Sequence, residues 1–206
     1  KMKKLGTSLL GTMGMAWAMG LGFGLGGDVG YSMSSYSVDT FKTSSSGLLY
    51  GGGAKIDLWI TDAMGLDLGG RYDMYNYSHT ENDITIKSKY NILAIPVFLK
   101  YGLPMAGMKP YFGLGFSVLK QMSGSVQVDT FPSADVADSL LEMDYAVLAG
   151  AGLNFPMGPL MLNPDLRFLY NLTPKGKNDT LSNSSASQMD FTLGVNFLYY
   201  MPLGGE

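Results

Sequence analysis

Large apolar residues alternate with small or polar residues in eight separate stretches of the chain. The first stretch, residues 19–33, has the sequence MGLGFGLGGDVGYSM, in which nearly every second side chain is large and apolar. The other seven stretches cover residues 48–61, 65–77, 91–101, 111–118, 144–155, 160–171 and 189–199. A period of two is typical of a β-strand whose two faces meet different surroundings. The pattern therefore predicts an all-β protein with eight antiparallel strands.

The segments between these stretches alternate in length. Short links fall at residues 61–65, 102–108 and 156–159, and long polar links fall at residues 34–47, 76–88, 122–142 and 173–188. Long strands with short turns at one end and long loops at the other are typical of an up-and-down transmembrane β-barrel. Because the number of strands is even, both termini are predicted to lie at the short-turn end, which is the periplasmic side of such barrels.

The two faces of the predicted strands differ in their chemistry. One face is predicted to contact lipid, and its residues include Leu21, Phe23, Leu25, Ile56, Leu58, Leu66, Leu68, Ile95, Val97, Phe112, Leu114, Phe116, Val147, Leu153, Leu166, Phe168, Leu193, Val195 and Phe197. The other face carries glycines and the charged residues Asp28, Lys55, Asp57, Asp67, Arg71, Asp73, Lys100, Asp144, Asp165, Arg167 and Asp190. An eight-stranded barrel is only just wide enough for side chains, and buried charges need partners. The charged face is therefore predicted to form a salt-bridge plug beside a wall kept slim by glycine.

Two alternatives use the same pattern. A soluble eight-stranded barrel such as a lipocalin would place the apolar residues inside and the polar residues outside. A narrow barrel could not pack so many large apolar side chains inward, which favours the transmembrane interpretation. Within that interpretation, the polar face could instead form an ion pathway, which would make the protein a small channel.

The hairpin at residues 61–67 gives a specific prediction of strand register. Thr61 is expected opposite Asp67, with Gly65 at a positive φ. This register produces two opposite-charge pairs across the strands, Lys55 with Asp73 and Asp57 with Arg71.

Aromatic residues and one loop complete the structural predictions. Tyrosines near strand ends are expected to form the girdles at the membrane interfaces; they are Tyr72, Tyr77, Tyr90, Tyr101, Tyr111, Tyr170, Tyr199 and Tyr200. In a long link, residues 133–142 (SADVADSLLE) are predicted to form a short helix capped by Ser133. The apolar face of this helix would cover the barrel mouth or meet a partner.

The first residues have the three parts of a secretory signal. A basic start, KMKK, precedes an apolar run and the small-residue motif Ala16-Trp17-Ala18. Residues 1–18 are therefore predicted to be a signal peptide cleaved after Ala18, which leaves residues 19–206 as the barrel. A retained membrane helix is the alternative, since residues 5–27 carry no charge. The many glycines in this segment disfavour a helix.

Composition restricts the class of protein. Only 15% of the 206 residues are charged, whereas about 25% is average, and 28 residues are Gly. This balance argues against an ordinary cytosolic enzyme, and the 46% hydrophobic content argues against a disordered chain. The net charge of −3 gives no indication of nucleic-acid binding. Because the chain has no Cys, disulfides and thiolate chemistry are excluded.

Candidate chemistry is sparse. The single histidine, His79, has Ser78 and Glu81 nearby in sequence, but this combination is ordinary for an exposed loop. Gly22, Gly24 and Gly27 fit the spacing G-x-G-x-x-G, yet more strand-like alternation follows where a nucleotide-binding loop requires a helix. No catalytic residue, cofactor or metal site is predicted.

Several stretches resemble the bacterial outer-membrane β-barrel domain family of OmpA-like and PorT-like proteins. They are NILAIPVFLKY (91–101), KPYFGLG (109–115), DYAVLAGAGLNFP (144–156) and LRFLYNL (166–172). The resemblance implies an eight-stranded barrel in the outer membrane of a diderm bacterium, in contact with lipid and lipopolysaccharide and with other envelope proteins as further partners. It does not imply one function, because such barrels serve many. We expect a non-enzymatic protein with a structural or partner-binding role; the alternatives are a small channel and a lipid-modifying enzyme that uses His79.

Overall fold

The computed structural model describes residues 20–38, 41–81, 84–103, 105–129, 131–135, 143–172 and 184–203. These residues contain nine strands: β1 (Gly20–Val38), β2 (Phe41–Trp59), β3 (Met64–Glu81), β4 (Ile84–Gly102), β5 (Lys109–Val128), β6 (Ala134–Asp135), β7 (Met143–Met157), β8 (Leu160–Asn171) and β9 (Ser184–Pro202). The predicted signal peptide lies outside the described residues. Within those residues, no helix is long and apolar enough to cross a membrane.

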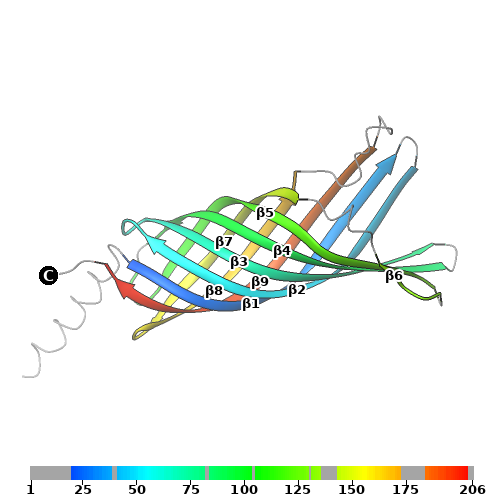
Figure 1. The fold of residues 1–206 in the computed structure, drawn as a ribbon. Helices are drawn as coiled ribbons and strands as arrows, with labels where there is room; N and C mark the ends of the chain where they lie inside the picture. The colour runs from blue at the N-terminus through cyan, green and yellow to red at the C-terminus, as the bar shows by residue number, and fades with distance from the viewer. Residues whose placement is uncertain are drawn as a thin grey trace, which may run out of the picture.

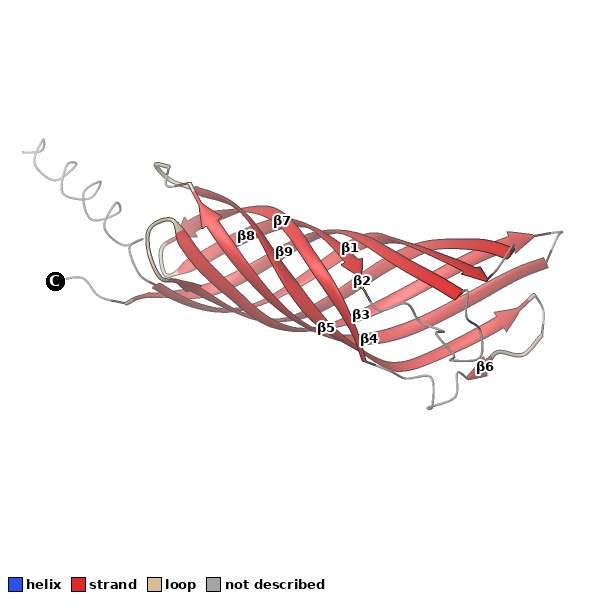
Figure 2. Cartoon of the chain, turned by 90° about the horizontal axis from the view of Figure 1, so that it is seen from above, coloured by secondary structure: helices blue, strands red, loops and turns tan. Residues whose placement is uncertain are grey.

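Eight long antiparallel strands form a closed barrel. Each strand pairs with its neighbours in sequence, and the ring closes because β1 pairs with β9. The two-residue strand β6 lies outside this ring and adds to β5. Two views of the ribbon show the same cylinder of tilted strands, with short turns at one end and long hairpins at the other (Figures 1 and 2). The predicted all-β, eight-stranded antiparallel barrel is confirmed.

The strands are staggered around the ring. Starting at Leu21 on β1, the cross-strand partners are, in order, Leu58, Leu66, Leu99, Leu114, Ala149, Phe168, Phe191 and Tyr31. The path thus returns to β1 at Tyr31, ten residues beyond Leu21. This offset along the strand is the shear of the barrel. A closed barrel with a shear of this kind has strands that tilt about 35–45° from its axis.

Two of the predicted long loops are strands instead. β1 and β2 stay paired as far as Val38 and Phe41, and β3 and β4 as far as Glu81 and Ile84. The links predicted at residues 34–47 and 76–88 are therefore extensions of two hairpins. The alternation ends there because polar residues occupy both faces, although the backbone pairing continues. A membrane-spanning strand needs only about 9–11 residues, so these strands of 18–19 residues extend beyond the membrane.

The predicted helix at residues 133–142 is not supported where the structure describes it. Ala134 and Asp135 form β6 and pair with Val126 and Ser125 of β5. Residues 136–142 lie outside the described part of the chain. Pairing with β5 gives the backbone N–H and C=O groups of this segment hydrogen-bond partners without a helix.

Glycine keeps the inner wall thin beside charged side chains. A Cβ on Gly51 would lie 2.1 Å from Oδ1 of Asp73 and 2.8 Å from the backbone oxygen of Tyr72. By contrast, a Cβ on Gly70 would meet nothing within 4 Å. Gly70 is exposed on the outside of the barrel.

Candidate functional site

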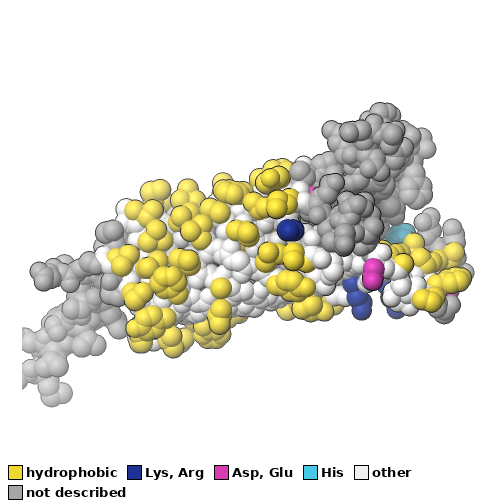
Figure 3. Space-filling view, in the orientation of Figure 1, with side chains coloured by type: hydrophobic (Ala, Val, Ile, Leu, Met, Phe, Trp, Pro, Cys, Tyr) yellow, Lys and Arg dark blue, Asp and Glu magenta, His cyan; other side chains and the backbone are white. Residues whose placement is uncertain are grey.

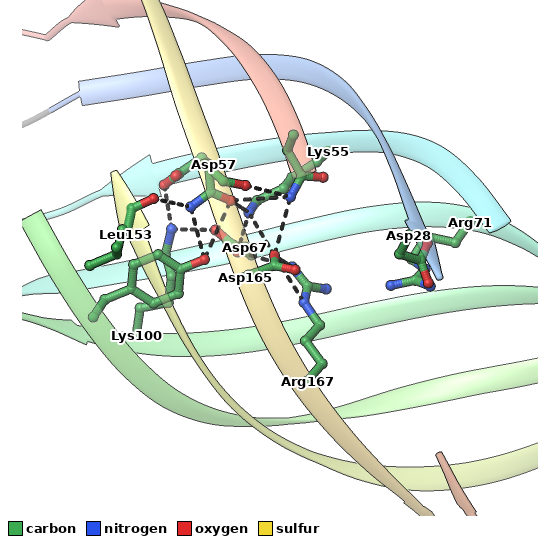
Figure 4. A network of polar contacts seen from close by, with 12 residues as sticks. Asp28, Lys55, Asp57, Asp67, Arg71, Lys100, Leu153, Asp165 and Arg167 are labelled. Atoms are coloured by element: carbon green, nitrogen blue, oxygen red, sulfur yellow. Dashed lines mark hydrogen bonds and ion pairs between the residues drawn. The ribbon is translucent and has the colours of Figure 1, made fainter. Parts of the chain in front are cut away.

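A network of ion pairs fills the barrel near its short-turn end. Asp57 of β2 and Asp67 of β3 are direct cross-strand partners, and both carboxylates are buried. Lys100 of β4 reaches between them, with Nζ 2.8 Å from Asp57 Oδ1 and 2.5 Å from Asp67 Oδ1. Lys55 lies 2.9 Å from the other oxygen of Asp67. The four side chains point toward one another in the close view (Figure 4).

The same network continues to β8 across the barrel. Arg167 Nη2 lies 2.7 Å from Asp165 Oδ2 and 3.8 Å from Asp67 Oδ2. Lys55 Nζ donates a hydrogen bond of 2.6 Å to Asn163 Oδ1 and lies 3.9 Å from Asp165. We call this group the short-turn network; its members are Lys55, Asp57, Asp67, Lys100, Asn163, Asp165 and Arg167. Shared partners make this a connected structure rather than a set of separate pairs.

The register predicted for the β2–β3 hairpin is wrong. Asp57 faces Asp67 rather than Arg71, and Lys55 faces Gly69 rather than Asp73. Two like charges therefore lie opposite each other, which Lys100 from the next strand compensates.

Turn chemistry explains the difference in register. Thr61 is outside the strand pairing, and its hydroxyl accepts hydrogen bonds from the backbone N–H groups of Ala63 (3.2 Å) and Met64 (2.9 Å). Strand pairing resumes at once, with Gly65 opposite Trp59. Gly65 is not among the described residues with positive φ, so the predicted special conformation is absent there.

An aromatic and cationic layer closes the short-turn end. The Trp59 ring is fully buried, with Lys109 Nζ 3.3 Å and Lys100 Nζ 4.7 Å from its centroid. Lys100 also lies 4.9 Å from the Tyr111 ring. Phe98 packs in the same buried cluster. Cations over aromatic faces are favourable, most of all where water is excluded.

Lys109 was missed by the sequence analysis, although a signal for it exists. It is in phase with Tyr111 and Ser117, which both point inward on β5. Tyr111 itself was predicted to lie in an interfacial girdle, and the structure corrects this because the ring is buried inside.

A separate group of ion pairs lies nearer the long hairpins. Arg71 Nη2 lies 3.0 Å from Asp73 Oδ1 and also pairs with Asp28. Figure 4 shows this group at a distance from the short-turn network. Asp144, also buried, accepts a hydrogen bond of 3.4 Å from Asn171.

Asp190, also nearer the long hairpins, is surrounded by hydrogen-bond donors. Ser32 Oγ donates to Oδ1 at 2.5 Å, the Tyr75 hydroxyl donates to Oδ2 at 2.8 Å, and Gln188 Nε2 donates at 3.2 Å. Tyr77 shares a hydrogen bond of 2.7 Å with Ser32. Tyr77 was predicted as a girdle residue, but it is buried and stacks on Tyr75 with ring centroids 6.0 Å apart. Hydrogen-bonded polar clusters of this kind occupy interior space that water would otherwise fill.

Two small cavities lie between these groups in the described part of the barrel. One cavity of about 30 Å³ lies between Arg71, Asp28 and Arg167, and another of about 30 Å³ lies between Arg71, Asp190 and Ser117. Volumes of this size hold one or two water molecules.

The outer surface of the barrel carries the large apolar residues. Figure 3 shows them as a broad zone over the end with the short turns. Most residues predicted to contact lipid are exposed, for example Leu25 at 70% and Leu114 at 69%. The partly exposed members are Leu21, Leu58, Leu66, Val97, Leu153 and Phe168. Among the predicted girdle residues, Tyr72, Tyr101 and Tyr199 are exposed, while Tyr90 and Tyr200 pack partly against the interior clusters.

Ser78 and His79 point to opposite faces of β3. His79 lies on β3 opposite Ile86 and is partly buried, whereas Ser78 is exposed. Successive residues of a strand point to opposite faces, so Ser78 and His79 do not lie on the same side. Over the described residues, no group of three or more acidic or histidine side chains is placed to hold a metal ion.

Comparison with known proteins places the chain among bacterial barrels. The family model described as outer membrane protein beta-barrel domain matches residues 13–175. The structure is similar to OprG from Pseudomonas aeruginosa, with 14% identity, a TM-score of 0.52, and coverage of 90% of this chain and 97% of OprG.

Two further solved structures are similar at lower scores. Neisserial surface protein A has 16% identity and a TM-score of 0.48, with 84% of this chain and 95% of that chain covered. The outer membrane enzyme PagL has 16% identity and a TM-score of 0.43, with 82% and 97% covered. No curated protein matches the sequence.

Proposed function

This chain belongs to the outer membrane protein beta-barrel domain family, as the resemblance predicted, and we propose that it is a closed, non-enzymatic barrel with a structural or partner-binding role. Membership of this family places the protein in the outer membrane. The more specific role is inferred from the interior and from the long hairpins.

The filled interior is the observation that carries this proposal. The buried short-turn network, the Trp59 layer and the Asp190 cluster leave cavities of about 30 Å³ among the described residues. An ion pathway needs continuous water, whereas here the charged side chains are bonded to one another. Barrels of eight strands are generally filled in this way.

The orientation follows the rule for bacterial barrels. We place the short turns and both ends of the barrel domain on the periplasmic side, with the extended hairpins β1–β2 and β3–β4 outside the cell. Exposed residues of these hairpins, such as Ser44, can contact other envelope components or partners outside the cell. The outer surface around Leu25 and Leu114 contacts lipid and lipopolysaccharide.

Conductance in planar bilayers tests the closed interior. The wild-type protein is expected to give no discrete current steps in concentrated KCl. A Trp59→Ala/Lys109→Ala variant, which removes two residues of the closing layer, serves to show whether any path passes through it. Regular current steps from the wild-type protein would overturn the proposal in favour of a small channel.

Partner binding is tested in the native membrane. A photo-crosslinking residue at Ser44, on the extended part of β2, is expected to capture specific envelope proteins, while the same residue at lipid-facing Leu25 is not. Crosslinks that are identical at both positions, or absent from both, would contradict a binding role for the hairpins.

The non-enzymatic assignment has its own test. The alternative activity to examine is a lipid modification that uses His79, the single histidine of the chain. A His79→Ala strain is expected to have the same lipid profile as the wild-type strain. Loss of one lipid modification in that strain would replace the structural role with an enzymatic one.

A further inference from the structure

A polar hollow lies on the outside of the barrel near the long hairpins. Its volume is about 270 Å³, and its lining includes Tyr50, Asn76, Lys89, Asn91, Ser123 and Asp135. Tyr75, whose hydroxyl binds Asp190 inside the barrel, also borders this hollow, but its exposed lining residues lie outside the interior networks.

Strand register builds the hollow from two parallel rows. One row is Tyr50, Met74, Asn91 and Ser123, which are successive cross-strand partners on β2 to β5. The next row is Asn76, Lys89, Ser125 and Asp135, on β3 to β6. Because cross-strand partners share a face, the exposed Tyr50 shows that both rows point away from the interior.

A β-bulge changes which residues of β5 point outward, so that Ser123 and Ser125 join these rows. The register shifts by one residue between Asn91 and Ile92, so that Ile92 pairs with Gln121 and Asn91 pairs with Ser123. Ile92 and Gln121 are buried, whereas Ser123 is exposed. Bulges commonly redirect side chains at the rims of barrels, and here the bulge places Ser123 and Ser125 beside Asn91 and Lys89.

The hollow lies just beyond the apolar zone. On β4, Leu99 and Ile95 are exposed apolar residues at 51% and 50%, and in the same alternating phase the strand then carries the exposed Lys89 and Lys87. On β5, the change occurs between Phe116 and Ser123. In an outer membrane, the level beyond the apolar zone is occupied by the headgroups of the lipids.

The lining combines three kinds of chemistry. Lys89 is exposed, and no ion pair to it is found among the described residues. The Asn91 amide donates a hydrogen bond of 2.7 Å to Ser123 Oγ. Tyr50, 43% exposed, provides an aromatic surface. Asp135 adds a carboxylate that accepts hydrogen bonds from hydroxyl groups.

We propose that this hollow binds the phosphorylated sugar headgroup of an outer-leaflet glycolipid. Lys89 pairs with the phosphate, the amides and hydroxyls of Asn76, Asn91 and Ser123 bind sugar hydroxyls, and Tyr50 packs against the ring. Lys87, exposed on the same strand, adds to the positive potential at this level. The inference rests on the proposed orientation, with the long hairpins outside the cell.

Binding of three lipids to the full chain in detergent micelles tests this site. The probes are a bisphosphorylated diglucosamine glycolipid, the same glycolipid after dephosphorylation, and phosphatidylglycerol. We expect the wild-type protein to bind the first about tenfold more tightly than the second, which is the size of one charge-assisted hydrogen bond. Phosphatidylglycerol is expected to bind weakly, because it carries phosphate without the sugar.

Two lysine variants separate the site from general surface charge. Lys89→Gln is expected to remove most of the preference for phosphate. Lys120→Gln, on an exposed lysine of β5 that does not line the hollow, is expected to retain it. Equal losses in both variants, equal binding of the two glycolipids, or equal binding of phosphatidylglycerol would overturn the proposal.

Labelling distinguishes failure of the site from failure of the orientation. The chain has no Cys, so a Lys89→Cys variant carries a single thiol. Reaction of that thiol with a membrane-impermeant maleimide on intact cells places the hollow outside the cell. If this thiol is not labelled on intact cells but is labelled after lysis, the orientation is wrong and the glycolipid proposal fails with it.

Discussion

Asp57 and Asp67 face each other across the β2–β3 hairpin, and the ammonium group of Lys100 lies 2.8 Å from one and 2.5 Å from the other. All three side chains are buried. Lys55 also pairs with Asp67, but Lys100 is the cation that both carboxylates share, and it comes from the next strand. This dependence predicts how the barrel responds when that cation is removed.

Replacing Lys100 with Met is expected to lower the free energy of unfolding by about 3–5 kcal/mol, because two buried carboxylates lose their shared partner. Urea unfolding in lipid vesicles, followed by the gel shift between folded and unfolded barrel, measures the change. The triple variant Lys100→Met/Asp57→Asn/Asp67→Asn is expected to recover most of the loss. Lys89→Met, on the outer surface, is the control. A small effect of Lys100→Met would show that the ion pairs contribute little.

The faces of the strands could be predicted from the sequence more readily than their register. A period of two assigns each residue to a face whatever its partner, so Lys55, Asp57 and Asp67 share one phase in the sequence alone. The register depends on which residues form the turn. Thr61 lies in the turn, where its hydroxyl binds two backbone N–H groups, and every partner on β3 differs by four residues from the prediction.

The tyrosines show a second limit of sequence analysis. Tyrosine is common both at membrane interfaces and in interiors where its hydroxyl finds a partner. Tyr77 and Tyr111 were predicted at the interface from their positions near strand ends, but both are inside. Their acceptors and donors, Ser32 and Asn163, come from strands far away in sequence, so the choice depends on tertiary contacts.

Gly51 is expected to tolerate no added methyl group. In Gly51→Ala, the Cβ would approach Asp73 Oδ1 and the backbone of Tyr72, and the free energy of unfolding should fall by about 1–3 kcal/mol. Gly70→Ala is the matched control, because nothing lies within 4 Å of that position. Both variants are compared by thermal unfolding and gel shift. Equal stability of the two variants would contradict the tight inner wall.

Trp59 is expected to be shielded from solvent in the folded barrel. The chain has two Trp residues, so a Trp17→Phe variant reports Trp59 alone. Its ring is fully buried between Lys100 and Lys109, and acrylamide should therefore quench its fluorescence only weakly until the protein is unfolded.

A second tryptophan position provides the comparison for quenching. Trp59→Phe/Ile60→Trp in the same background moves the indole to a neighbouring position that is 50% exposed. Quenching by lipids with brominated acyl chains is expected to be much stronger for this variant. Similar quenching of both indoles would mean that the short-turn end is open to its surroundings.

Asp190 is expected to stabilise the barrel through its donors rather than through an ion pair. Asp190→Ala leaves the buried hydroxyls of Ser32 and Tyr75 without their acceptor, and we expect it to lower the free energy of unfolding by about 2–4 kcal/mol. Asp62→Ala, at an exposed position in the β2–β3 turn, is the control and should change it by less than about 0.5 kcal/mol.

A double-mutant cycle assigns this loss to particular hydrogen bonds. Tyr75→Phe removes one donor and should cost about 1 kcal/mol on its own, but much less in the Asp190→Ala background, where the acceptor is already gone. Urea unfolding of the four proteins gives the coupling free energy. If the two substitutions are additive, the hydroxyl of Tyr75 and the carboxylate of Asp190 do not depend on each other, and the interior at this level is held by packing of the aromatic rings instead.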